Sequence, residues 1–218
     1  MNQTYPVDPQ GCWQQILNHP VVFNNQTPAL FIDRDGVLIE ERHYLKNPNE
    51  VKLLPGAADL IKLANLSNIA VIVVTNQGGI GRHYFGWSDF KAVQERIYDD
   101  LAKTGAFVNA VYACPHHGKG IAPYDQGDHM DRKPNPGMIL KAVDALDINI
   151  NQSWMIGDKA SDISAAKNAN LKGALHVLTG HGNDKGERLG VKKLKSAGFE
   201  IQCKDSIKDG KSIIGLFS

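Results

Sequence analysis

The stretch Ala29-Leu30-Phe31-Ile32-Asp33-Arg34-Asp35-Gly36 decides how this chain folds. Its four apolar residues predict a short buried strand, and the two carboxylates that follow precede a glycine that can turn the chain. Because side chains along a strand alternate with a period of two, Asp33 and Asp35 should leave its end on roughly the same side. The stretch therefore predicts a buried strand that delivers paired acids to a site, and this geometry suits metal-assisted phosphoryl transfer.

The composition limits the class of protein. The 218 residues are 42% hydrophobic and 22% charged, which suits one compact domain with a sizeable core. Lysine and arginine number 24 against 23 aspartate and glutamate, so no overall field favours nucleic acid or an anionic membrane. No apolar run approaches the roughly 20 residues that span a bilayer, and residues 1–6 lack the features of a secretion signal. We expect a soluble, cytoplasmic protein that binds neither nucleic acid nor membranes.

Short apolar runs alternate with segments of helical period, a pattern that predicts a parallel sheet covered by helices on both faces. The predicted strands cover 29–32, 69–74, 108–113, 153–156 and 174–178. The predicted helices cover 57–66, a segment capped by Ser88 that continues to Leu101, and a segment from Pro136 to about Leu146.

Two regions fall outside this alternation. Residues 1–28 are polar except for Trp13, Ile16 and Leu17, whose spacing allows one short amphipathic turn that packs on the domain or contacts a second copy. Residues 180–198 should combine a loop with an amphipathic helix, followed by an edge strand near residues 199–202. We therefore divide the chain into an N-terminal arm, residues 1–28, and a catalytic domain, residues 29–218.

Residues that can bind metal or phosphate follow several predicted strands. In an open parallel sheet, ligands bind beyond the carboxyl ends of the strands. Thr75, Asn76 and a glycine-rich turn follow the second strand, Asp158 and Asp162 follow the fourth, and Arg132-Lys133-Pro134 precedes a helix. Each group alone has a structural explanation, as a turn, a helix cap or an exposed basic step. Their shared placement predicts a Mg²⁺ and phosphate site.

A calcium-binding loop is the main alternative for the Asp-x-Asp-Gly motif. An EF-hand needs a ligand at its fifth position and a glutamate at its twelfth. Val37 and Tyr44 occupy these positions, so the motif is not an EF-hand.

Four separated motifs resemble those of the haloacid dehalogenase-like (HAD-like) phosphatases. They are Asp33-x-Asp35-Gly36, Thr75-Asn76, Lys133 and Gly157-Asp158-x-x-x-Asp162. The resemblance implies a Rossmann-like sheet, an aspartyl-phosphate intermediate formed on Asp33, and Asp35 as the general acid and base. It also implies that Thr75 and Lys133 hold phosphoryl oxygens. Asp33, the main-chain carbonyl of Asp35 and Asp158 would bind Mg²⁺, which fits the preference of this ion for oxygen ligands.

The spacing of the motifs indicates which subclass of HAD-like phosphatase the chain resembles. Neither the 40 residues from Asp35 to Thr75 nor residues 114–133 leave room for a cap domain, so loops must recognise the substrate. The resemblance is strongest to the D-glycero-D-manno-heptose 1,7-bisphosphate phosphatases and the related histidinol-phosphate phosphatases. It implies a substrate flap at residues 41–44 and a phosphate clamp at Arg132. The expected substrate-binding residues are Arg34, Glu41, Arg42, His43, Tyr44, Asn76, Gln77, Gly78, Arg132 and Lys159.

A second metal site is implied for the loop 114–133. Relatives of this type bind a structural zinc through Cys-x-His followed by Cys-x-Cys, whereas this chain has Cys114 and His116 followed by His129 and Asp131. Zinc accepts cysteine, histidine and carboxylate ligands, so a site made of these four residues is chemically reasonable. Loss of the metal is the alternative. The odd number of cysteines, three in all, argues against a disulfide framework.

The sequence thus predicts a Mg²⁺-dependent phosphatase for a small phosphorylated sugar, with heptose 1,7-bisphosphate as the expected substrate. Histidinol phosphate is the alternative substrate, because Glu40 or Glu41 can supply the acidic surroundings that its amine would favour. A catalytically idle binding module of the same fold is the alternative from another class. We expect a monomer or a weak homodimer.

Overall fold

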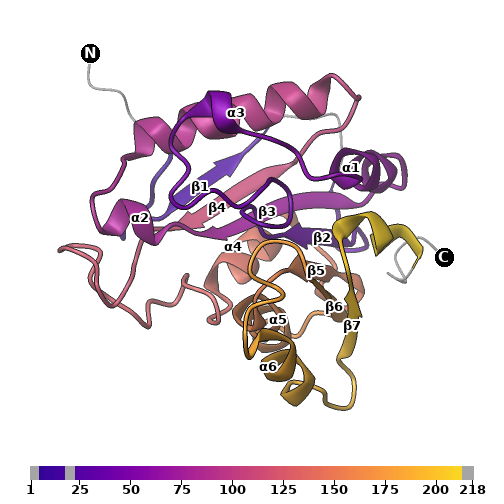
Figure 1. Ribbon diagram of the computed structural model, residues 1–218. Helices are drawn as coiled ribbons and strands as arrows, with labels where there is room; N and C mark the ends of the chain where they lie inside the picture. The colour runs from indigo at the N-terminus through magenta and orange to yellow at the C-terminus, as the bar shows by residue number, and fades with distance from the viewer. Residues whose placement is uncertain (1–4, 18–22, 213–218) are drawn as a thin grey trace.

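A seven-stranded sheet forms the centre of the computed structural model, which describes residues 5–17 and 23–212 (Figure 1). The strands lie in the order β1-β4-β3-β2-β5-β6-β7, and only β1 runs antiparallel to its neighbour. Their bounds are β1 Trp13–Ile16, β2 Ala29–Ile32, β3 Ala70–Asn76, β4 Ala110–Cys114, β5 Trp154–Gly157, β6 Gly173–Val177 and β7 Glu200–Lys204. The six parallel strands thus follow the 3-2-1-4-5-6 order of a Rossmann fold.

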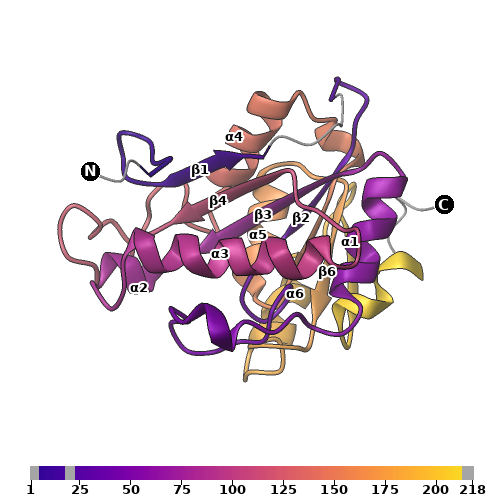
Figure 2. The same ribbon diagram turned by 90° about the horizontal axis from the view of Figure 1, so that it is seen from above.

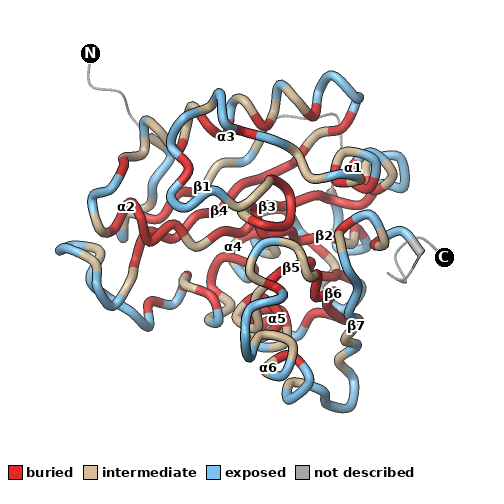
Figure 3. Tube along the Cα trace, in the orientation of Figure 1, coloured by how far each residue is buried: buried red, intermediate tan, exposed pale blue. Residues whose placement is uncertain are grey.

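Helices cover both faces of the sheet, as predicted. On one face, α1 (Ala57–Leu66) and α3 (Trp87–Ala102) pack against one apolar cluster, and on the other α4 (Gly137–Leu146) and α5 (Ala160–Asn168) pack against a second (Figures 1 and 2). The central strands are buried along their whole length, which explains their continuous apolar sequences (Figure 3). The remaining elements are short: α2 Gly78–Gly81, α6 Glu187–Lys193, and 3₁₀ turns at Pro48–Glu50, Ile150–Gln152 and Ile207–Ser212.

Two local predictions were wrong. Trp13 and Ile16 lie on strand β1 rather than on an amphipathic turn, because this segment pairs with the free edge of β4. Helix α3 begins at Trp87, so Ser88 lies inside its first turn; the Asp89 carboxylate instead accepts a hydrogen bond from the Gly86 N–H at 2.8 Å. The division of the chain at residue 28 stays a prediction.

The topology positions the candidate site. The strand order reverses between β2 and β5, and ligands of open α/β sheets bind at such a switch point. Asp33 directly follows β2 and Asp158 directly follows β5. Only the 3₁₀ turn 48–50 and helix α1 lie between β2 and β3, so no cap domain is inserted there. No helix in residues 5–17 or 23–212 has the length and apolar character needed to cross a membrane.

Candidate active site

A pocket of about 520 Å³ opens at the carboxyl ends of β2, β3 and β5. It is lined by thirteen of the residues that the sequence predicts for catalysis or substrate binding: Asp33, Arg34, Asp35, Glu41, His43, Tyr44, Thr75, Asn76, Gln77, Gly78, Arg132, Lys133 and Lys159. Asp162, which the sequence places at the site, also lines the pocket, together with four polar residues that were not assigned to it: Arg82, His117, Ser161 and His181. The structure therefore brings nearly all of the predicted residues together.

Two predicted residues do not line the pocket. Arg42 is exposed, and its guanidinium pairs with the Glu40 carboxylate at 3.0 Å. Asp158 lies beneath the pocket and is fully buried. Its carboxylate belongs to a cluster with Asp33 and Asp162, in which one oxygen from each residue lies within 4.8 Å of the others.

Lys133 holds two members of this acidic cluster. Its Nζ donates to Asp33 Oδ1 at 2.5 Å and to the Val74 carbonyl at 2.8 Å, and it lies 2.7 Å from Asp162 Oδ1. Burial alone would lower the pKa of Lys133, but the carboxylates of Asp162 and Asp33 raise it above its usual value. The lysine is therefore a permanent cation between two acids.

The acidic cluster carries more negative charge than Lys133 can balance. Burial, followed by the charges of Asp33 and Asp162, raises the pKa of Asp158 to about 8. Burial also raises the pKa of Asp33 to about 6, against the opposing effect of Lys133. These shifts show that the cluster holds its acids under mutual repulsion, which a bound cation would relieve.

The donor set fits Mg²⁺. Asp158 Oδ2 accepts a hydrogen bond from the His181 N–H at 2.7 Å, but Asp158 Oδ1 is buried with no hydrogen-bond partner. A buried carboxylate oxygen without a donor is costly, and carboxylate oxygens are the ligands that Mg²⁺ prefers. Asp33 and Asp158 would therefore hold the ion. Asp162, which the sequence did not assign as a ligand, lies in the same cluster.

Asp35 is held apart from the acidic cluster by its own hydrogen bonds. Both Nε and Nη2 of Arg34 donate to its carboxylate, with the shortest distances at 2.8 Å, and Gln77 Nε2 donates to Oδ2 at 2.8 Å. Gln77 also donates to Thr75 Oγ1 at 2.8 Å. Arg34 is 1% exposed and packs on Phe90, so this guanidinium orients Asp35 instead of projecting freely into the pocket.

Asn76 fixes the position of Lys133. Its side-chain amide donates to the Lys133 carbonyl and accepts from the Lys133 N–H, both at 3.0 Å. These two bonds join the end of β3 to the loop that precedes α4. The sequence predicts that Asn76 contacts the substrate. Asn76 lines the pocket, and it also holds Lys133 in position.

A group of cations lies at another part of the pocket wall. The Arg82 guanidinium lies over two aromatic rings, 4.8 Å from the ring centre of Tyr44 and 5.0 Å from that of Tyr84, and donates to the Tyr44 hydroxyl at 2.6 Å. Arg132 is anchored by a 2.7 Å bond to the His116 carbonyl. Partial burial, then the positive charges of Arg132 and Arg82, lower the pKa of His117. The two arginines therefore place positive charge at the same part of the pocket.

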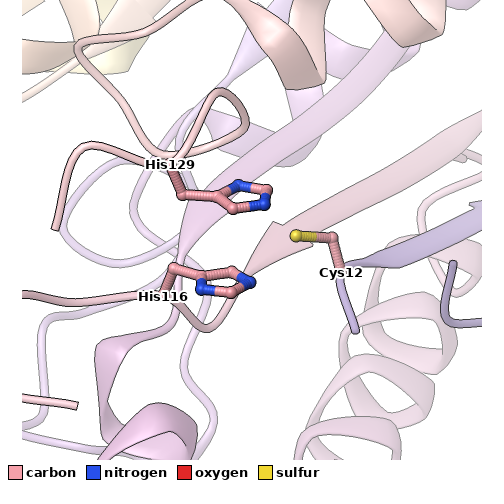
Figure 4. Close-up of side chains that lie close together, drawn as sticks. All are labelled: Cys12, His116 and His129. Carbon is pink, nitrogen blue, oxygen red and sulfur yellow. The ribbon is translucent and has the colours of Figure 1, made fainter. Parts of the chain in front are cut away.

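Of the residues predicted to bind zinc, the structure groups His116 and His129 with Cys12, which was not predicted, and it groups Asp131 with Cys12 and Asp8 instead. The rings of His116 and His129 stack with their centres 3.8 Å apart, and the Cys12 sulfur faces a nitrogen of each ring (Figure 4). The neighbouring Cys114 side chain, burial and Asp131 all raise the pKa of the Cys12 thiol. Asp131 also forms an ion pair with Lys141. Sequence reasoning missed Cys12 because 101 residues separate it from Cys114 along the chain.

Comparison with known proteins defines the class first. Residues 130–194 match the HAD-hydrolase-like family. Among solved structures, a candidate HAD-like phosphatase from Mesorhizobium loti superposes with a TM-score of 0.86 at 35% identity, covering 98% of this chain and 96% of the other. The D,D-heptose 1,7-bisphosphate phosphatase from B. bronchiseptica, solved with magnesium and phosphate, superposes with a TM-score of 0.66 at 26% identity. The match covers 80% of this chain and 92% of the other. The chain is a HAD-like phosphatase.

Sequence relatives identify the family within this class. The D-glycero-beta-D-manno-heptose-1,7-bisphosphate 7-phosphatase of Mesorhizobium japonicum is 42% identical over 77% of this chain and 76% of its own length. The enzyme of the same name from Escherichia coli is 35% identical over 70% of this chain and 80% of its own length. The chain belongs to this heptose-bisphosphate phosphatase family of HAD-like enzymes, which confirms the resemblance that the motifs predict.

Proposed function

We propose that this enzyme removes the 7-phosphate from D-glycero-D-manno-heptose 1,7-bisphosphate in the cytoplasm. One observation carries the choice of a bisphosphate: the pocket that contains Asp33 also contains a separate pair of arginines, Arg82 and Arg132. A guanidinium binds phosphate through two parallel hydrogen bonds, so this pair suits a phosphate remote from the reacting one. The names of the sequence relatives support the same substrate.

Asp33 is the proposed nucleophile. Its carboxylate attacks the phosphorus of the 7-phosphate, a bond forms between Asp33 and phosphorus, and the bond from phosphorus to the sugar oxygen breaks. Lys133 holds Asp33 and would contact a phosphoryl oxygen, while the Thr75 hydroxyl would donate to another. Bound Mg²⁺ would reduce the repulsion between the two anions and stabilise the charge on the transferring group.

Asp35 is the proposed general acid and base. It would give a proton to the departing sugar oxygen and then take one from the water that hydrolyses the aspartyl-phosphate. Arg34 and Gln77 hold its carboxylate in place, and the side chain stays 20% exposed at the pocket wall. This restraint keeps the carboxylate directed for both proton transfers.

Histidinol phosphate is the competing substrate. Its imidazole and amine would favour an acidic surface, and Glu41 is the acid that the pocket offers for this purpose. The positive charges of Arg82 and Arg132 would oppose an amine and attract a second phosphate. The charge distribution therefore favours the bisphosphate.

Steady-state kinetics with Mg²⁺ test the proposal. We expect kcat/KM for heptose 1,7-bisphosphate to exceed that for histidinol phosphate by at least about tenfold, since one well-placed ionic contact contributes about 1.5–3 kcal/mol. Phosphorus NMR of the product should show the 1-phosphate retained. A preference for histidinol phosphate, or loss of the 1-phosphate first, would contradict the substrate that we propose.

The oligomeric state and the metals belong to the same proposal. We infer a monomer or weak homodimer that binds one Mg²⁺ at Asp33 and Asp158, with the Asp35 carbonyl as a third protein ligand. For the second metal, the predicted zinc ligands are Cys114, His116, His129 and Asp131. Size-exclusion chromatography with light scattering and metal analysis of untagged protein test these statements.

A further inference from the structure

The cluster behind the pocket joins three parts of the chain that are distant in sequence. Cys12 precedes the edge strand β1, His116 follows β4, and His129 lies in the loop before α4. All three side chains are buried, and their ligand atoms lie within 4.8 Å of one another. Neither histidine was predicted to lie beside a residue of the N-terminal arm.

Strand register explains why Cys12 reaches this place. In the antiparallel pair of β1 and β4, Trp13 lies opposite Ala113. One further step along the ladder places Cys12 opposite Cys114, and directly opposed residues carry their side chains on the same face of a sheet. Both cysteine side chains are buried, which agrees with this position.

The residues of the cluster have unused bonding capacity. His116 Nδ1 is buried without a hydrogen-bond partner, and both cysteines are free of disulfides. His116 Nε2 contacts the Gln10 carbonyl at 3.0 Å, and His129 Nδ1 accepts from the Asp131 N–H at 3.1 Å. The Cys12 thiol and the two imidazoles have ligand atoms within 4.8 Å of one another, and the buried Cys114 lies opposite Cys12. Two cysteines and two histidines are a donor set typical of a structural zinc site.

We infer that Cys12 is a zinc ligand, completing a site with Cys114, His116 and His129 and thereby tying the edge strand β1 to the loop that carries Arg132 and Lys133. This set differs from the predicted one by one exchange: Cys12 replaces Asp131. Asp131 already forms an ion pair with Lys141, which also pairs with Asp8. A thiolate is a better zinc ligand than a carboxylate that is paired with a lysine, because zinc is a borderline-soft ion.

Binding requires a local rearrangement. The two histidine rings are stacked and nearly parallel, with 3° between their planes, so one ion cannot lie in both ring planes. Tetrahedral ligands must converge on the ion, so at least one ring has to turn. Turning His116 would release its contact with Gln10, which lies two residues before Cys12. Zinc would then replace this contact as the link between the arm and the loop.

X-ray absorption at the zinc edge tests the ligand set on the wild-type enzyme. Untagged protein, grown with zinc and purified under reductant, should contain about one zinc per chain. The spectrum should show two sulfur ligands at about 2.3 Å and two nitrogen ligands at about 2.0–2.1 Å. Protein without zinc, or zinc with fewer than two sulfur ligands, would overturn the inference.

A pair of cysteine variants identifies Cys12 itself. Cys12→Ser should weaken zinc binding by more than about tenfold in a chelator competition, since even loss of an outer-shell partner costs 10–100-fold. It should also remove about half of the sulfur-to-cobalt charge-transfer absorption of the Co²⁺-substituted enzyme. The matched control is Cys203→Ser, because Cys203 is exposed on β7. Equal zinc affinity and equal absorption in the two variants would show that Cys12 is not a ligand.

Discussion

At the scale of single residues, Arg82 shows how the pocket prepares a cation for a ligand. Tyr44 and Tyr84 hold its guanidinium at the pocket wall, where no carboxylate neutralises it among the hydrogen bonds and ion pairs of the described residues. A cation held by aromatic faces keeps its charge available for an anionic ligand. Arg82 is therefore suited to bind the second phosphate of a bisphosphate.

Replacing Arg82 should weaken binding of the bisphosphate. We expect Arg82→Gln to raise KM for heptose 1,7-bisphosphate by about tenfold or more, because it removes a charge-assisted contact worth about 1.5–3 kcal/mol. kcat for a small monophosphate should change little. Arg42→Gln is the matched control, since Arg42 is exposed and lies outside the pocket wall. Equal KM values for the two variants would remove Arg82 from the substrate site.

Replacing the proposed nucleophile should stop turnover. Asp33→Asn keeps the shape of the side chain but cannot form the aspartyl-phosphate, so kcat with Mg²⁺ should fall by about 1,000-fold or more. Asp125→Asn, at an exposed position outside the pocket, should leave kcat unchanged. Circular dichroism of both variants checks their folding. Substantial turnover in Asp33→Asn would show that Asp33 is not the nucleophile.

The sequence identified most of the pocket residues because of their positions relative to the strands. Asp33, Thr75 and Lys159 each lie just beyond or at the end of a strand, where the topology of a parallel sheet brings them together. It did not identify Arg82 as a pocket residue, since its placement depends on contact with Tyr44 from a separate loop as well as with the nearby Tyr84. Side-chain contacts of this kind leave no periodic signal in the sequence.

At the scale of secondary structure, strand β1 belongs to the packed core of the enzyme. Trp13 is 1% exposed, and its ring centre lies 5.1 Å from that of Phe90 and 5.4 Å from that of Trp87, both on helix α3. The strand thus adds a large aromatic side chain to one apolar face of the sheet. This segment was difficult to predict because it has four residues, two of them glutamine, and pairs with a strand almost 100 residues away.

Removing the Trp13 side chain should destabilise the whole domain. We expect Trp13→Ala to lower the free energy of unfolding by about 3–5 kcal/mol, the usual cost of a large cavity in a core. Ile16→Ala on the same strand, where the side chain is 51% exposed, should stay within about 0.5 kcal/mol of wild type. Denaturant unfolding with a constant m-value measures both. A small effect at Trp13 would mean that β1 is not part of the cooperative fold.

At the scale of the whole molecule, the sheet, the acidic cluster and the stability of the fold are coupled. The order of the parallel strands was predictable as a class, because continuous apolar runs between helical segments indicate a sheet covered on both faces. The raised pKa values of Asp33 and Asp158 were not predictable, since these acids and Asp162 repel one another at the distances that the pairing of β2 with β5 sets. The same pairing that builds the site therefore places like charges together inside the protein.

This coupling predicts how pH changes the stability of the metal-free enzyme. An unfolded aspartate loses its proton near its ordinary pKa of 3.8, whereas in the folded protein the pKa of Asp158 is raised to about 8 and that of Asp33 to about 6. Between these values the folded state binds more protons than the unfolded state. The free energy of unfolding should therefore fall as pH rises from about 4 to about 8, by at most about 1.4 kcal/mol per pH unit for each retained proton.

Magnesium should reverse this loss of stability. The ion competes with protons for Asp33 and Asp158, so the rise in Tm at a fixed Mg²⁺ concentration should be larger at about pH 8.5 than at about pH 5.5. Asp158→Asn removes one ligand and one titrating group, and it should abolish most of the Mg²⁺ effect while flattening the pH dependence without metal. Asp125→Asn, outside the cluster, should behave as wild type. A Mg²⁺-induced shift of equal size at both pH values would contradict the proposed ligation, because a metal bound to these raised carboxylates must displace their protons.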